Sequence, residues 1–111
     1  MPKSTQSETI EQGPPSVAEI IYQQLGGGQF RAMTGSKSFI AYPDALVFAI
    51  PPNKSAARKV RITLLSSDTY RMEFFRQMKI DPIKDLTHED VYFDQLQEIF
   101  TQVTGFFTRL F

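Results

Sequence analysis

The chain has 111 residues, 41% of them apolar and 13% aromatic, which is enough for one domain with a hydrophobic core. Twelve Lys and Arg residues balance twelve Asp and Glu residues, so the formal net charge is zero. The absence of cysteine excludes disulfides, thiol nucleophiles and cysteine-ligated metal sites, and a single histidine excludes zinc motifs built on two histidines.

Hydropathy along the chain gives a first expectation about location. No stretch approaches the roughly 20 apolar residues of a membrane span, so we expect no membrane partner. Residues 1–6 lack the apolar run of a signal peptide, and we therefore expect a cytoplasmic protein.

Charge is distributed unevenly. Residues 54–79 carry seven basic and two acidic side chains, whereas residues 80–111 carry two basic and six acidic ones. The neutral total thus arises by cancellation between segments, and the middle of the chain is expected to present a basic surface.

The N-terminal third begins with a polar segment, residues 1–15, which contains three prolines, lacks hydrophobic periodicity and is expected to be a flexible arm. Ser16 is a predicted N-cap with Glu19 as its capping-box partner, and apolar residues at helical spacing predict a short helix over 16–25. The run Gly26-Gly27-Gly28 is expected to end this helix. Residues 16–111 are assigned to a single domain.

From residue 29 the apolar residues alternate with polar ones, which predicts a series of β-strands. The expected strands cover residues 29–34, 38–42, 46–50, 59–64 and 70–75, with turns or loops between them. The side chains expected to point inward are Leu46, Phe48, Ile50, Val60, Ile62, Leu64, Tyr70, Met72 and Phe74.

A second helix is predicted from residue 88 to residue 104, with its apolar face formed by Tyr92, Leu96, Ile99, Phe100 and Val103 and its end at Gly105. The expected fold class is α+β. It consists of an antiparallel meander sheet of four to five strands, with a short N-terminal helix and a longer C-terminal helix packed on one face.

The sheet face that the helices leave open is expected to be basic, with apolar residues between the charges. Single-stranded nucleic acid is bound by positive grooves with aromatic platforms on which bases stack. The candidate nucleic-acid-binding residues are Arg31, Lys59, Arg61, Arg71, Phe75 and Lys79, with Phe75 and Met33 as platforms. A solvated sheet face in which Arg71 and Lys59 pair with Glu73 explains the same pattern, and this alternative stays open.

No residue pattern predicts catalysis. Lys37 follows Gly35-Ser36 without the spacing of a phosphate loop, and indicates a hairpin turn. His88 and the acids around it fit a helix start, and the spacing of the acids does not match a calcium loop. Asp68 and Tyr70 fit a turn followed by a core position. We expect a protein without enzymatic activity, metal site or cofactor.

Several sequence blocks carry a resemblance. LGGGQFRAMTGSKSF at 25–39, VRITL at 60–64, DTYRMEF at 68–74, LQEIFT at 96–101 and TG at 104–105 resemble a family of small proteins encoded by bacteriophages and integrating mobile elements. The resemblance covers about residues 17–108. It implies a genetic setting and a bacterial host cell, and it implies no mechanism.

A second resemblance concerns architecture alone. A curved antiparallel sheet followed by one long helix is similar to the PC4-like single-strand-binding proteins. No motif matches residue by residue, so no binding residues are carried over.

The sequence therefore favours a non-enzymatic accessory protein of a phage or mobile element that binds nucleic acid, single-stranded by preference, through its basic sheet face. The alternative is a protein-interaction module that docks on or inhibits a host or phage protein. Its expected interface is the apolar tail, formed by Phe106, Phe107, Leu110 and Phe111. A homodimer through this tail or through a sheet edge also stays open.

Overall fold

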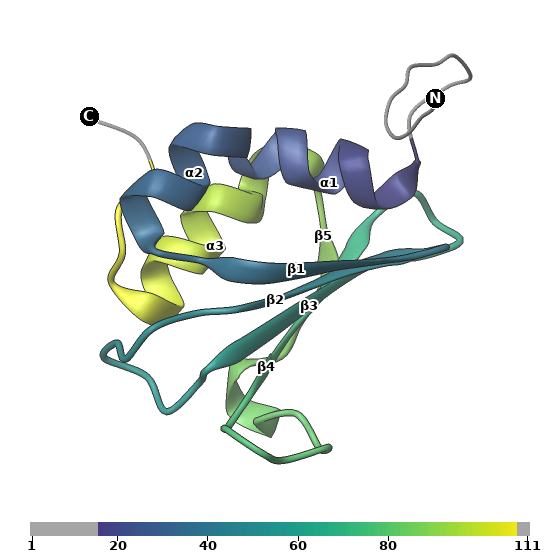
Figure 1. Ribbon diagram of the computed structural model, residues 1–111. Helices are drawn as coiled ribbons and strands as arrows, with labels where there is room; N and C mark the ends of the chain where they lie inside the picture. Colours follow the sequence, from purple (N-terminus) through teal and green to yellow (C-terminus); the bar gives the residue numbers. More distant parts are fainter. Residues whose placement is uncertain (1–15, 109–111) are drawn as a thin grey trace, which may run out of the picture.

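The computed structural model describes residues 16–108, in which three α-helices cover one face of a five-stranded sheet (Figure 1). This arrangement confirms the α+β class and the meander sheet. The predicted flexible arm, residues 1–15, lies outside the described residues. None of the helices in residues 16–108 is long and apolar enough to cross a bilayer.

The first helix, α1 (Val17–Leu25), begins at the predicted cap. The Ser16 side chain accepts a hydrogen bond from the Glu19 amide at 3.2 Å, and the Glu19 carboxylate accepts one from the Ser16 amide at 2.9 Å. These reciprocal bonds confirm the capping box. Ile21 and Leu25, one turn apart, are fully buried and fix the helix on the sheet.

The sheet contains β1 (Lys37–Tyr42), β2 (Ala45–Ala49), β3 (Lys59–Leu64), β4 (Tyr70–Phe75) and β5 (His88–Val91). All neighbouring pairs are antiparallel and the spatial order is β1-β2-β3-β4-β5, a simple meander. The first four strands match four of the predicted ones closely. The fifth strand of the sheet comes from a segment that was expected to be helical.

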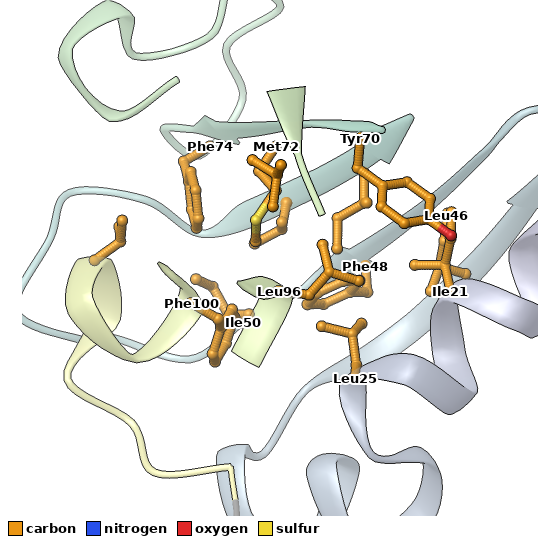
Figure 2. Close-up of a cluster of buried hydrophobic side chains, with 14 of the residues drawn as sticks. Ile21, Leu25, Leu46, Phe48, Ile50, Tyr70, Met72, Phe74, Leu96 and Phe100 are labelled. Carbon is orange, nitrogen blue, oxygen red and sulfur yellow. The ribbon is translucent and has the colours of Figure 1, made fainter. Parts of the chain in front are cut away.

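The inward side chains of these strands form the core with the helices, as Figure 2 shows. Phe48 and Phe100 lie at its centre, each of them with an edge-on contact to Phe30. The alternation predicted for β2, β3 and β4 is confirmed, because their even-numbered side chains from Leu46 to Phe74 face the helices, and all but the partly exposed Leu64 are buried.

The strand predicted over residues 29–34 is wrong, because this segment forms the helix α2 (Gly27–Thr34). Gly26, with φ of 123°, turns the chain between α1 and α2, and the left-handed Gly35 ends α2. Phe30 and Thr34 are buried, and the Thr34 hydroxyl donates to the Phe30 carbonyl at 2.7 Å. Phe30 and Thr34 are four residues apart, a spacing that places both on one face of a helix. A segment of six residues is too short to distinguish this helical spacing from the alternation of a strand.

The helix predicted over residues 88–104 is correct only in its second half. α3 (Leu96–Thr104) has nine residues, the same length as α1, and ends at the left-handed Gly105 as predicted. Before it lie β5, which pairs Val91 with Tyr70, and the 3₁₀ turns η1 (Lys84–Leu86) and η2 (Phe93–Gln95). Strand pairing prevails here because β5 supplies backbone partners to β4, which would otherwise be an open edge.

Candidate nucleic-acid interface

The sheet face opposite the helices, which we call the outer face, brings together most of the predicted binding residues. Across β3 and β4, Lys59 lies opposite Phe75, Arg61 opposite Glu73, and Thr63 opposite Arg71. Residues paired in this way point to the same side of a sheet. Lys59, Arg61, Arg71 and Phe75 therefore occupy one surface, as the alternation predicts.

This surface is concave. A groove with a volume of about 540 Å³, which we call the outer groove, runs over β2, β3 and β4 and reaches the β1–β2 turn and the connection that follows β4. Its lining includes Tyr42, Val47, Lys59, Arg61, Arg71 and Ile80. Three basic side chains thus share one concavity with apolar and aromatic groups and with the carboxylates of Asp44 and Glu73.

Two of the three cations are paired. Arg61 donates a hydrogen bond from Nε to Oε1 of Glu73 at 2.9 Å, and its Nη2 lies 2.9 Å from the same oxygen in an ion pair. Arg71 lies 3.4 Å from Glu89 on β5, and both of these side chains are substantially exposed. Glu73 therefore pairs with Arg61, and not with Arg71 or Lys59 as the solvated-face alternative expects.

Phe75 lies on the outer face, but it is covered and only 2% exposed. The Lys59 ammonium lies 4.8 Å and the Arg61 guanidinium 5.2 Å from the centre of its ring. These contacts are within the range of cation–π attraction and orient both cations over the ring. The ring is consequently a support for the cations and not an open platform for bases.

The exposed ring at this groove is Tyr42, at the end of β1, which sequence reasoning did not single out. Tyr42 is 48% exposed and pairs with Ala45 across the β1–β2 hairpin. A signal was available, because Ile40 and Tyr42 alternate with Phe39 and Ala41 in the predicted strand and so share one face.

Three of the predicted residues, Arg31, Met33 and Lys79, do not lie on the outer face. Arg31 belongs to α2, in the helical layer, and its guanidinium lies 6.0 Å from the centre of the Phe39 ring. The prediction for Arg31 and Met33 is wrong because residues 29–34 form a helix and not a strand. Lys79 follows β4 in an exposed connection, beside Ile80 at the rim of the outer groove.

The apolar tail is only partly exposed to solvent. Phe106 is partly buried and stacks on Phe100, with 6.4 Å between ring centres. Phe107 is 72% exposed. Leu110 and Phe111, the other two predicted interface residues, lie outside the described residues.

Lys37, His88 and Tyr70, for which no catalytic role was predicted, have structural contacts. Lys37 follows the end of α2 and begins β1, so Gly35-Ser36-Lys37 joins a helix to a strand and not two strands of a hairpin. His88 lies on β5, not at a helix start, with Nδ1 2.9 Å from the Leu86 carbonyl. The Tyr70 hydroxyl donates a hydrogen bond to Gln24 at 2.8 Å, and burial raises the pKa of this hydroxyl.

Comparisons with family models, with curated proteins and with solved structures found no match for this chain. The resemblance to proteins of phages and mobile elements, and the architectural likeness to PC4-like proteins, therefore stay predictions.

Proposed function

We propose that the protein binds single-stranded nucleic acid in the outer groove and has no enzymatic activity. The observation that carries this proposal is the presence of Lys59, Arg61 and Arg71 in one concavity of about 540 Å³ with the half-exposed ring of Tyr42 at its rim. Such a combination supplies cations for phosphates and a flat surface for a base.

A single strand fits these features better than a duplex. Its bases are free to stack on aromatic side chains, whereas the bases of a duplex are stacked on one another and present only their edges. Tyr42 contributes a ring face of this kind, and among residues 16–108 no long basic helix lies on the outer face that would enter a major groove.

Carboxylates in and beside the groove limit the affinity, because Asp44 and Glu73 line the groove and Glu89 pairs with Arg71 next to it. Arg71 is held by Glu89 at 3.4 Å in an exposed pair, and such pairs are weak enough for a phosphate to replace the carboxylate. Arg61 is held more closely by Glu73. We expect Lys59 and Arg71 to make the first phosphate contacts, and the binding to weaken steeply as salt is raised.

The test is fluorescence anisotropy with labelled single- and double-stranded oligonucleotides at about 50 and 200 mM salt. We expect tighter binding of the single strand. Arg71→Gln should weaken it and reduce the slope of log K against log salt by about one.

Arg31→Gln is the matched control, because it removes the same charge from the helical layer. It is expected to leave the affinity near that of the wild type. Anisotropy that does not change at low salt would reject the proposal, and equal losses for both variants would show that the outer groove is not the site.

A second candidate function, a protein-interaction module, is favoured by the exposed edge of β1. Ile40 and Tyr42 on this edge strand are 50% and 48% exposed, and residues Phe39–Tyr42 carry no charge. An edge strand of this kind can pair with a strand of a host or phage protein, or with a second copy in a homodimer. Binding that Ile40→Lys abolishes, and that salt does not affect, would support this candidate.

The proposed setting follows from the resemblance and not from the groove. Membership of a phage or mobile-element family would make the protein an accessory factor in the cytoplasm of a bacterial host. Single-strand binding suits such a setting, because replication and recombination of mobile DNA expose single strands.

A further inference from the structure

The connection between β4 and β5 carries two apolar side chains that are almost fully exposed. Met78 is 93% and Ile80 90% exposed, far more than Ile40 or Tyr42 on the sheet edge. Figure 1 shows this connection projecting from the sheet on the side away from the helices. Burying either side chain against a partner would be favourable by the hydrophobic effect.

The projecting segment is held at its base. The Ile83 amide donates to the Phe74 carbonyl at 2.7 Å, and the Lys79 amide donates to the Arg76 carbonyl at 3.2 Å. Met78 lies inside the turn that the Lys79–Arg76 bond closes and adopts a left-handed φ of 64°. The turn therefore presents Met78 and Ile80 from a closed loop and not from a loose one.

The loop is continuous with the outer groove. Ile80 lines that groove together with Lys59, Arg61 and Arg71, and also lines a second hollow of about 490 Å³ with Met78 and Lys79. A ligand in the outer groove thus meets Ile80, and then Met78, where it leaves the basic surface.

A ligand that satisfies both parts has to combine negative charge with apolar faces. In nucleic acids the phosphates supply the charge and the bases supply the faces, and Ile and Met are among the side chains that proteins insert between bases. We infer that Met78 and Ile80 insert between successive bases of the strand that crosses the outer groove. This inference rests on the function proposed above.

The shape of the surface argues against an anionic membrane as the partner. A bilayer is flat and would reach the projecting tip, whereas Lys59, Arg61 and Arg71 lie in a concavity behind it. At the tip itself the cations Arg76 and Lys79 are offset in part by Asp81. The cations that would attract the partner are therefore placed for a strand that enters the groove.

The test uses a single-stranded oligonucleotide that contains 2-aminopurine, whose fluorescence rises when its stacking is disrupted. The wild-type protein should raise the fluorescence on binding. The double variant Met78→Ser, Ile80→Ser should abolish this rise and weaken the affinity about tenfold, with an unchanged salt slope because no phosphate contact is lost. Both positions are at least 90% exposed, so the variant should fold normally, which circular dichroism verifies.

Phe107→Ser is the matched control, since it removes an exposed apolar side chain from the other end of the described chain. It should behave like the wild type. If the wild type binds and the double variant retains both affinity and fluorescence rise, the insertion is rejected while the outer groove stands. If the wild type binds no oligonucleotide, the proposed function itself fails. Vesicles of phosphatidylserine and phosphatidylcholine provide a third arm: vesicle binding that the double variant loses, with oligonucleotide binding unchanged, would assign the loop to membranes and overturn the inference.

Discussion

Arg61 and Glu73 face each other across β3 and β4, and the arginine reaches one carboxylate oxygen with both Nε and Nη2 at 2.9 Å. The two partners differ in exposure, because the side chain of Arg61 is 44% exposed and that of Glu73 only 11%. Glu73 is thus a largely buried acid in a groove that also contains three basic side chains. It pairs with Arg61, which an incoming phosphate would otherwise bind.

Glu73→Gln is accordingly expected to strengthen nucleic-acid binding. The amide keeps the shape of the side chain and accepts a hydrogen bond from Arg61, but it no longer neutralises the guanidinium. One further phosphate contact should raise the salt slope by about one and the affinity at low salt by about three- to tenfold. Anisotropy titrations of the two proteins at several salt concentrations measure both quantities, and identical titrations would show that Arg61 takes no part in binding.

Arg61→Ala is expected to destabilise the fold, because it leaves a largely buried carboxylate without its partner. The loss in free energy of unfolding should be about 1–3 kcal/mol in a urea titration. Arg71→Ala is the matched comparison: its pair with Glu89 is longer and exposed on both sides, and its loss should stay below about 1 kcal/mol.

The double variant Arg61→Ala, Glu73→Gln separates the unpaired charge from other effects of the truncation. Removing the charge should restore part of the stability lost in Arg61→Ala, so Glu73→Gln is expected to be stabilising in that background. A double variant less stable than Arg61→Ala would mean that the loss arises instead from the contact of the Arg61 guanidinium with the Phe75 ring.

Gly26→Ala is expected to lower the free energy of unfolding by about 1–3 kcal/mol, because residue 26 has a φ of 123° that side chains rarely adopt. An added Cβ would also lie 3.1 Å from Nε2 of Gln97, which donates to the Leu25 carbonyl and ties α3 to the end of α1. Chemical denaturation measures the loss.

Gly28→Ala is the control for this substitution. Gly28 lies in α2 with no heavy atom within 4 Å of an added Cβ, so alanine should be neutral or stabilise the helix by up to about 1 kcal/mol. Equal losses for the two alanines would indicate that the conformation at Gly26 is not the cause.

The fold was predictable wherever local pattern and tertiary pairing agree. Ser16 and Glu19 specify their cap within four residues, and β2, β3 and β4 alternate over five or six residues each. The predictions for residues 29–34 and 88–95 were wrong because the apolar residues in such short segments fit both the helical and the strand period. Residues 29–34 form a helix in which Phe30 packs on Phe100, and part of residues 88–95 forms a strand that pairs with the edge of β4. Both contacts are made with residues far away in the sequence.

The sequence predicts which cations lie on the outer face, but it does not predict their partners or which apolar side chains are exposed beside them. Alternation places Lys59, Arg61 and Arg71 on one face whatever their partners are. The burial of Phe75 depends on which cations lie over its ring, and the partner of Arg71 depends on β5, for which the sequence pattern predicts a helix. Met78 and Ile80 carry no periodic signal, so their exposure emerges only with the three-dimensional structure.

Tyr70→Phe is expected to make stability less sensitive to alkaline pH. Burial raises the pKa of the Tyr70 hydroxyl above its usual value of 10.0, so the folded state holds this proton more tightly than the unfolded state. The corresponding stabilisation is complete below about pH 10 and is lost as pH rises through the folded-state pKa. At neutral pH the variant should be less stable by about 0.5–1.5 kcal/mol, because the hydrogen bond to Gln24 is lost. Above pH 10 the difference from the wild type should shrink, which urea titrations between about pH 8 and 11 measure.

Gln24→Ala serves as the control, since it removes the hydrogen bond and keeps the titrating hydroxyl of Tyr70. Its loss of stability at alkaline pH should therefore persist. Parallel curves for wild type and Tyr70→Phe would show that folding does not perturb this hydroxyl.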